Sequence, residues 1–290
     1  PGPPEVLTDV EILAEGLVTP EGPVPMADGS ILLVEIDRGT LSRVRAGTTE
    51  VVAYCGGGPN GLAIGPDGAA YICNNGGVLP HYSGGRIERI DLESSEVQIL
   101  YREYDGEQLS APNDLVFDDK GGFWFTDSGA RRRRSRDYGR IFYAKVDGSE
   151  LRLVLDRVSL PNGIGLSPDG DTLYFVETYS ARLYRRTITG MGEVEHARVD
   201  DPETLLCGLP GLQWFDSLAI DSSGNICIAT MHSGCITAVS PNGSTVRQFL
   251  LPPHAYDPLP TNICFEGTEE QRAYITLSST GRLARCAWST

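Results

Sequence analysis

The chain has 290 residues, and its 24 Lys and Arg residues are outnumbered by 39 Asp and Glu residues, which gives a formal net charge of −15. A charge of this sign repels phosphate backbones, so it argues against general nucleic-acid binding and makes a divalent cation the more natural partner. The length permits one domain or two, and composition alone does not choose between them.

No apolar run is long enough to cross a membrane, and the first residues, PGPPEVLTDVEIL, lack the basic and apolar regions of a secretory signal. The chain contains seven cysteines without any C-x-x-C pair, and most of them lie in apolar segments such as AAYICN and GNICIAT. This pattern indicates buried thiols in a reducing compartment rather than a disulfide framework or a zinc knuckle. The sequence therefore predicts a soluble, cytoplasmic protein.

A short phrase, polar and then apolar, recurs six times along the chain at intervals of 39 to 54 residues. The phrases are PEGPVPM at Glu21, PNGLAIGPDG at Asn60, PNDLVFDDKGG at Asn113, PNGIGLSPDG at Asn162, FDSLAIDSSG at Asp216 and TNICFEG at Asn262. Repeats of this length are typical of propeller blades. We therefore expect six blades that begin near these six residues.

Within each repeat, segments rich in β-branched and aromatic residues alternate with turn signals such as Asp-Gly and Gly-Gly. The third repeat predicts strands over 114–118, 122–127, 139–148 and 151–158, the fourth over 163–167, 172–178, 181–188 and 193–200, and the fifth over 217–221, 226–230, 234–240 and 245–251. Helical spacing of apolar residues is not sustained anywhere. The pattern predicts an all-β fold: a single six-bladed β-propeller over residues 1–290, with four antiparallel strands per blade.

The two ends of the chain are expected to complete one blade together. After Asn262 the last repeat supplies only three strands, over 263–267, 272–278 and 282–288, while residues 8–15, TDVEILAE, form an additional strand-like segment. We predict that this N-terminal strand closes the last blade, which would remove the exposed edges of an open sheet.

The repeat also predicts where the six polar residues lie. The first strand of a propeller blade is innermost, so residues directly before it are expected to converge at one mouth of the central channel. The loops between second and third strands return to the same mouth. They are 37–39, 75–84, 128–139, 177–181, 230–234 and 277–281, and they are joined by the inter-blade loops 105–112, 201–215 and 252–261.

The six polar residues at this mouth offer only carboxylate and amide oxygens. Such a ligand set suits Ca²⁺ or Mg²⁺, with Mn²⁺ as a further candidate. A cation with open coordination positions could polarise a carbonyl or phosphoryl oxygen and lower the pKa of bound water. The alternative interpretation is that Asn and Asp are ordinary turn residues before a strand. Glu21 fits that alternative poorly, because Glu has little preference for turns.

The phrases around Glu21, Asn113, Asn162 and Asp216 give the chain a resemblance, over nearly its whole length, to the gluconolactonase, regucalcin and luciferin-regenerating enzyme family. The resemblance implies one catalytic divalent metal, usually calcium and sometimes zinc. It implies Glu21, Asn162 and Asp216 as ligands and Asn113 as a ligand or substrate contact. Asn60 and Asn262 have no equally clear family role.

The resemblance further implies hydrolysis of a lactone, with the metal at the carbonyl oxygen and water as the nucleophile. We expect Asp216 to be the general base, with Asn113 beside it in the catalytic group. Two alternatives remain open: a phosphotriester hydrolase that uses the same metal site, and a non-catalytic calcium-binding propeller. The expected partner is a small-molecule lactone, with no nucleic acid or membrane, and the chain is expected to be a monomer or a small homo-oligomer.

Substrate-binding candidates lie in the loops of the same mouth. Sugar-lactone members of the family carry an Arg where this chain has Ala111, which counts against an aldonolactone substrate. The loop SGARRRRSRDYG places Arg131 to Arg134 near the rim, where they could steer an anionic substrate or only be solvated. Further candidates for substrate contact are Asn60, His81, Tyr138 and His232.

Overall fold

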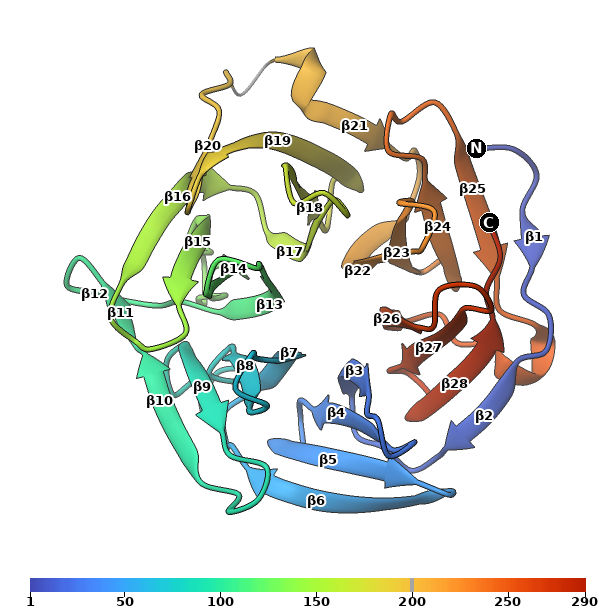
Figure 1. The fold of residues 1–290 in the computed structure, drawn as a ribbon, viewed down its shortest axis with the longest axis horizontal. Coiled ribbons are helices and arrows are strands. Elements are labelled where there is room, and N and C mark those ends of the chain that lie inside the picture. The colour runs from blue at the N-terminus through green and yellow to red at the C-terminus, as the bar shows by residue number, and fades with distance from the viewer. Residues whose placement is uncertain (199–200) are drawn as a thin grey trace.

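The computed structural model describes residues 1–198 and 201–290, and its regular structure is almost entirely β-strand. Six antiparallel sheets surround a central axis, and the chain passes through them in sequence order (Figure 1). Within each sheet the strands follow one another as a meander, so the first strand lies at the centre and the last at the rim. The prediction of a six-bladed β-propeller is confirmed.

The strands of the six blades are given in chain order. Blade 1 holds β3 (Pro20–Pro25), β4 (Ile31–Glu35), β5 (Thr40–Arg45) and β6 (Thr48–Tyr54), and blade 2 holds β7 (Pro59–Ile64), β8 (Ala70–Asn74), β9 (Arg86–Ile90) and β10 (Val97–Tyr101). Blade 3 holds β13 (Pro112–Phe117), β14 (Gly122–Asp127), β15 (Gly139–Lys145) and β16 (Leu151–Val158). Blade 4 holds β17 (Pro161–Leu166), β18 (Thr172–Glu177), β19 (Arg182–Gly190), β20 (Glu193–Val194) and β21 (Leu205–Gly208). Blade 5 holds β22 (Trp214–Ile220), β23 (Ile226–Met231), β24 (Cys235–Val239) and β25 (Val246–Leu250), and blade 6 begins with β26 (Pro260–Glu266), β27 (Arg272–Leu277) and β28 (Arg282–Ala287).

The N-terminal segment completes the last blade, as predicted. Strand β2 (Glu11–Ala14) pairs antiparallel with β28 and becomes the outer strand of blade 6. A second contact was not predicted: β1 (Glu5–Val6) pairs in parallel with β25 at the rim of blade 5. The N-terminus therefore covers the outer edges of two neighbouring blades.

Blade 4 departs from the prediction at its rim. Residues 193–200 were expected to form its fourth strand, but only β20 pairs there, as a short hairpin with the end of β19, and residues 199–200 lie outside the described residues. The outer position is taken instead by β21, from a segment predicted as loop, which follows the 3₁₀ turn η1 (Pro202–Thr204). The other small elements are the hairpin of β11 (Glu103–Tyr104) with β12 (Glu107–Gln108), and the turn η2 (Pro253–Ala255).

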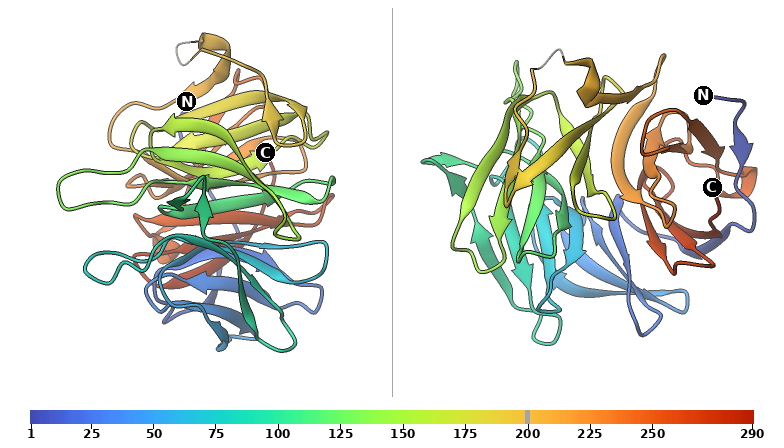
Figure 2. Two further views of the ribbon diagram at one scale, coloured as in Figure 1. Left: turned by 90° about the vertical axis from the view of Figure 1, so that its left-hand side faces the viewer. Right: turned by 45° about the horizontal axis from the view of Figure 1, so that its top comes forward.

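The six innermost strands form a closed ring around the axis. Each of them contacts the first strand of the next blade, in the order β3, β7, β13, β17, β22 and β26, and β26 contacts β3 again. The inner strands run roughly along the ring axis, whereas rim strands such as β6 and β19 lie across it, and loops project from both faces (Figure 1 and Figure 2). One hydrophobic cluster lies between each pair of adjacent blades among the described residues. Buried hydrophobic side chains therefore lie between the blades all around the ring, and polar side chains occupy its centre.

Two sequence-based inferences about the chain as a whole can be compared with the structure. All seven cysteines are free thiols, and burial raises the pKa of the Cys55 thiol to about 12, so these groups pack as small apolar side chains. In the part of the chain that the structure describes, no helix is long and apolar enough to span a bilayer.

Candidate metal and active site

The ladder of every inner strand is irregular at the polar residue of the repeat. The ladder between first and second strands shifts register at Glu21, between Pro59 and Gly61, between Pro112 and Leu115, and at the matching places of blades 4, 5 and 6. A bulge leaves a residue without a cross-strand partner and changes the direction of its side chain, and this holds for the polar residues of blades 2 to 5. In blades 1 and 6 the polar residue is paired and lies directly beside the shift, since Glu21 pairs with Val34 and Asn262 with Thr276. The polar residues thus lie inside the first strands, as second or third residue, and not before them as predicted.

Glycines beside the polar residues allow neighbouring inner strands to approach closely. A Cβ on Gly61 would lie 2.4 Å from the backbone oxygen of Asn113 in the next blade, and a Cβ on Gly163 would lie 2.7 Å from the backbone nitrogen of Leu218. Real Cβ atoms do not make contacts this short. The glycines of the Asn-Gly pairs therefore allow neighbouring inner strands to lie close together around a narrow channel.

We expect the substitution Gly61→Ala to destabilise the protein by about 1–3 kcal/mol, because the added methyl group meets backbone atoms that cannot rotate away. The measurement is thermal or urea unfolding of both proteins. Gly2→Ala is the matched control, since nothing lies within 4 Å of its added Cβ. Equal stability of Gly61→Ala and wild type would contradict this account of the channel.

Three carboxyl groups are buried together at the centre. The exposed fractions are 1% for Glu21, 5% for Asp114 and 8% for Asp216. Burial raises the pKa of Glu21 well above its ordinary value, and the negative charges of Asp216 and Asp114 raise it further. Burial also raises the pKa of Asp114 and of Asp216 to about 7, with a hydrogen bond from Asn162 opposing the shift at Asp216. Among the residues that the structure describes, no Lys or Arg forms an ion pair with any of these three carboxyl groups.

Asp114 was missed by the sequence analysis, although a signal was present. The repeat reads Pro-Asn-Gly at Asn60 and Asn162 but Pro-Asn-Asp at Asn113, so one blade carries a carboxylate where its neighbours carry glycine. The Asp114 Cα lies 2.7 Å from the position that a Cβ on Gly61 would take. Glycine in blade 2 therefore provides space for the acidic residue of blade 3.

Three amide oxygens around these carboxyl groups have no hydrogen-bond partner. They are the buried Oδ1 atoms of Asn60, Asn113 and Asn162. A buried polar atom without a partner is costly unless an ion or water completes it. The donor set of amide and carboxylate oxygens, with excess negative charge and unpaired acceptors, fits a hard divalent cation. Among the described residues no group of three His, Cys, Asp or Glu side chains has the geometry of a metal site, so the fit depends on the asparagines.

Two further side chains orient Glu21. Asn262 donates from Nδ2 to Glu21 Oε2 at 2.7 Å and accepts from the Ile263 amide through Oδ1, so its hydrogen-bonding groups are satisfied. The Ser217 hydroxyl donates to Glu21 Oε1 at 3.1 Å. The same hydroxyl is also within reach of Asp114, but it can serve only one acceptor at a time. Asn262 and Ser217 thus hold the carboxylate in place, whereas Asn60 belongs with the unpartnered oxygens.

We expect the metal-free protein to lose stability as pH rises from about 4 to about 7, through the carboxyl groups of Asp114 and Asp216. Both groups bind protons more tightly when folded than their ordinary value of 3.8 allows when unfolded, so folding is favoured most at low pH. The rise in the pKa of Asp114 corresponds to a change of at most about 4 kcal/mol in the free energy of unfolding over this pH range.

The measurement is the unfolding temperature of metal-free wild type and Asp114→Asn between pH 5 and pH 8. The variant, which has no charge at this position, should gain stability relative to wild type as pH rises. If the difference in unfolding temperature between the two proteins did not change with pH, the raised pKa of Asp114 would be contradicted. Asp119→Asn, in an exposed turn, controls for the change in net charge.

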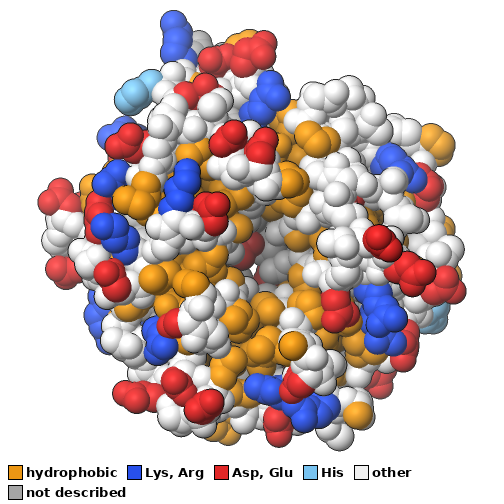
Figure 3. Space-filling model, in the orientation of Figure 1, with side chains coloured by type: hydrophobic (Ala, Val, Ile, Leu, Met, Phe, Trp, Pro, Cys, Tyr) orange, Lys and Arg blue, Asp and Glu red, His pale blue; other side chains and the backbone are white. Residues whose placement is uncertain are grey.

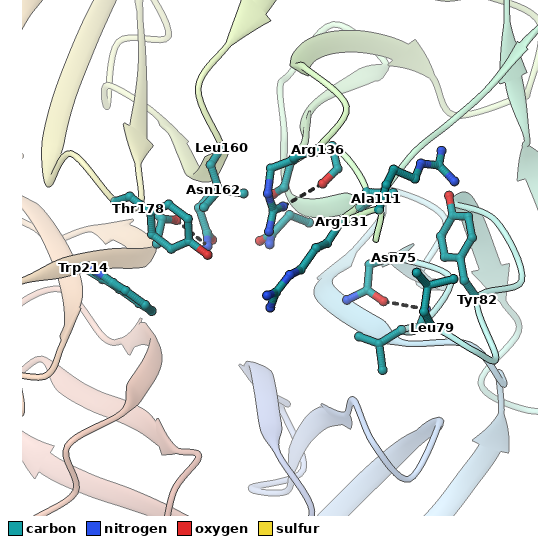
Figure 4. A pocket seen from close by; sticks show the side chains of 18 of the residues that line it. Asn75, Leu79, Tyr82, Ala111, Arg131, Arg136, Leu160, Asn162, Thr178 and Trp214 are labelled. Atoms are coloured by element: carbon teal, nitrogen blue, oxygen red, sulfur yellow. Dashed lines mark hydrogen bonds between the residues drawn. The ribbon is translucent and has the colours of Figure 1, made fainter. Parts of the chain in front are cut away.

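A cavity of about 730 Å³ opens above Asn113 and Asn162 (Figure 4). Its walls come from the loops after the second strands of blades 2, 3 and 4, and also include Ala111 from an inter-blade segment, Trp214 at the start of β22 and Met231 at the end of β23. The loops predicted for this mouth at 75–84, 128–139 and 177–181 therefore do surround it. The cavity is off-centre, toward blades 2 to 5.

The opposite mouth of the channel is different in character. The blades follow one another clockwise in Figure 1 and counter-clockwise in Figure 4, so the two views face opposite mouths. A cavity of about 460 Å³ opens there, with mostly apolar walls, and Asp114 and Asn262 are the polar side chains among its lining residues. In Figure 3 hydrophobic side chains surround the central hollow on this side.

The remaining predicted contact residues lie outside the cavity lining in the part of the chain that the structure describes. His81 is exposed in the loop after β8, and Tyr138 is 70% exposed and borders a separate groove. His232 is exposed and packs its ring edgewise against Trp214, with 4.5 Å between ring centroids. Arg131, Arg132 and Arg133 line the cavity, whereas Arg134 does not.

The fold and this site define a class: six-bladed propellers with a polar, oxygen-lined centre below a loop-walled cavity. Residues 19–279 match the SMP-30/Gluconolactonase/LRE-like region, and the chain belongs to this family. It is 28% identical over 253 residues to a Staphylococcus saprophyticus protein named Lactonase drp35, covering 84% of this chain and 72% of that one. It is 27% identical over 304 residues to a Zymomonas mobilis gluconolactonase, covering 94% and 80%.

Solved structures share the fold. A gluconolactonase from Xanthomonas campestris superposes with a TM-score of 0.78 at 21% identity, covering 99% of both chains. Regucalcin from Agrobacterium tumefaciens, described as a calcium-binding protein, superposes with a TM-score of 0.74 at 19% identity, covering 97% of this chain and 94% of that one.

Proposed function

We propose that the chain is a divalent-metal-dependent hydrolase that opens the ring of a lactone, a cyclic carboxylic ester. The observation that carries this proposal is the set of unpartnered oxygens of Asn60, Asn113 and Asn162 on the inner strands that also carry buried Glu21 and Asp216. Asn113 and Asn162 of this set line a cavity large enough for a small molecule. Membership of a family whose curated relatives include lactonases supports the type of reaction.

Glu21, Asn113, Asn162 and Asp216 would hold the cation, and Asn60 would complete the set. Calcium is the first candidate because every ligand is a carboxylate or amide oxygen, with Mn²⁺, Mg²⁺ or Zn²⁺ as others. The calcium-binding description of the regucalcin neighbour agrees with this order. When bound, such a cation polarises the lactone carbonyl and lowers the pKa of water beside it.

In this mechanism Asp216 accepts a proton from the attacking water. The water oxygen then bonds to the carbonyl carbon, the ring C–O bond breaks, and the proton returns to the departing alkoxide. Water and lactone thus give one open hydroxy acid. Asn113 lies on the cavity wall, where its Nδ2 can donate to the carbonyl oxygen as negative charge develops there.

The test uses chelator-treated protein and adds back Ca²⁺, Mn²⁺, Mg²⁺ or Zn²⁺ one at a time, with γ-butyrolactone, δ-gluconolactone and a dialkyl aryl phosphotriester as substrates. We expect at least one cation to restore lactone opening and none to support faster phosphotriester hydrolysis. A preference for the phosphotriester would identify the other hydrolase. Tight metal binding without turnover of any substrate would favour a calcium-binding propeller.

A further inference from the structure

Positive charge gathers at the mouth of the cavity, although the chain as a whole is acidic. Arg131, Arg132, Arg133 and Arg136 all line the cavity, and no Asp or Glu is among the described residues that do so. The complete chain has a formal net charge of −15. A low-dielectric cleft lined by one sign of charge attracts ligands of the opposite sign.

Two of these arginines already have partners within the protein. Arg132 pairs with Asp137 at 2.6 Å and lies over the Tyr82 ring. Arg136 donates to the Gly129 carbonyl oxygen at 2.8 Å. By contrast, no carboxylate among the described residues lies within 4.0 Å of Arg131 or Arg133. Figure 4 shows the Arg131 side chain extending into the middle of the cavity.

Most uncharged polar side chains of the walls are already hydrogen-bonded. The Ser128 hydroxyl donates to the Pro161 carbonyl, and the Tyr82 hydroxyl donates to the Ser110 carbonyl. Thr178 Oγ1 accepts from Asn162 Nδ2 at 3.2 Å, and Asn75 Oδ1 accepts from a backbone amide. The unpartnered Oδ1 atoms of Asn113 and Asn162 belong to the proposed cation site. The guanidinium group of Arg131 remains available to an anion.

Other parts of the walls are apolar and aromatic. Tyr179 and Trp214 pack with 4.6 Å between ring centroids, and both line the cavity. Val78 and Leu79, on the loop of blade 2, are among the exposed large hydrophobic side chains and line it as well. A ligand that fits these walls has an apolar body and one anionic group.

We propose that the substrate is a lactone that carries a carboxylate, and that Arg131 binds this carboxylate while the ring reaches the centre of the channel. The inference rests on the lactone hydrolysis proposed above. Glu21 and Asp216 are buried and do not line this cavity, and a divalent cation would offset the charge of their carboxyl groups. A planar guanidinium can bind a carboxylate through two parallel hydrogen bonds.

The experiment compares γ-butyrolactone γ-carboxylate with the matching γ-carboxamide, in wild type, Arg131→Gln and Arg134→Gln, each loaded with the metal that supports turnover. We expect wild type to prefer the carboxylate by about tenfold to a hundredfold in kcat/KM, mostly through KM. Arg131→Gln should reduce this preference to about threefold or less, as one charge-assisted contact is lost. Arg134→Gln is the matched control: it removes the same charge from the same loop, but from a residue outside the cavity lining.

Calorimetric binding of the carboxylate lactone to metal-free protein, which separates recognition from turnover, should weaken in Arg131→Gln and persist in Arg134→Gln. Equal turnover of both lactones by wild type would overturn the inference about the anion and leave lactone hydrolysis standing. Equal loss of preference in both variants would also overturn it, because the effect would then come from the net positive charge of the loop and not from a contact made by Arg131. Absence of turnover for both lactones with every cation would instead overturn the proposed function.

Discussion

Replacing Asp216 with asparagine is expected to lower kcat for lactone opening by about a thousandfold while the protein stays folded. The side chain keeps its size and its place in β22, but it loses the charge that would bind the cation and the oxygen that would accept the proton. General-base catalysis typically contributes about 10²–10⁴-fold. The fold should tolerate the change, because burial raises the pKa of Asp216 to about 7 and a neutral group fits that environment well.

The measurement is steady-state kinetics at saturating metal, together with the unfolding temperature. Asp119→Asn provides the control, since it makes the same chemical change in an exposed turn between β13 and β14. Normal turnover by Asp216→Asn would exclude Asp216 as the base. If turnover falls at the metal concentration that saturates wild type but is restored at a higher concentration, Asp216 would be assigned to metal binding alone.

Replacing Glu21 with glutamine is expected to weaken metal binding by about a hundredfold or more. Glu21 is the most buried of the three central carboxyl groups, and Asn262, Ser217 and the Gly22 amide all donate to it. Loss of a partner that only orients a ligand typically costs about 10–100-fold in metal affinity, so loss of a charged ligand should cost at least as much.

Calorimetric titration of metal-free protein with CaCl₂ measures this effect without any enzymatic assay. Glu93→Gln, at an exposed turn of blade 2, is the matched control and should bind as wild type does. If Glu21→Gln bound metal with unchanged affinity, the ligand set proposed here would be wrong. Circular dichroism of the variant separates loss of affinity from loss of folding.

The blades were predictable because their signals are local. Alternating β-branched and aromatic residues, turns such as Asp67-Gly68 and the even repeat are properties of short segments, and neighbouring strands of one blade are also neighbours in sequence. The prediction failed at the rim of blade 4, where β21 replaced the expected segment. A rim strand pairs with a neighbour on one side only. The sequence pattern of a segment therefore predicts less reliably whether that segment takes the rim position.

The candidate site was predictable in its members but not in its contacts. The repeat identified Glu21, Asn113, Asn162 and Asp216 as residues that could meet, and each lies at the bulge of an inner strand. Asp114 was missed because its role depends on space left by Gly61 in another blade. The relative importance of Arg131 among four consecutive arginines likewise depends on where each side chain points.

The sequence by itself determined the six-bladed propeller, the closing N-terminal strand and the group of residues that could surround the axis, because periodicity and turn chemistry act over short stretches of chain. Only the tertiary structure decided that Asn262 is hydrogen-bonded while Asn60, Asn113 and Asn162 keep unpartnered oxygens, and that Asp114 joins Glu21 and Asp216. The physical reason is that burial and hydrogen bonding at the axis depend on atoms from different blades, which the closure of the ring brings together.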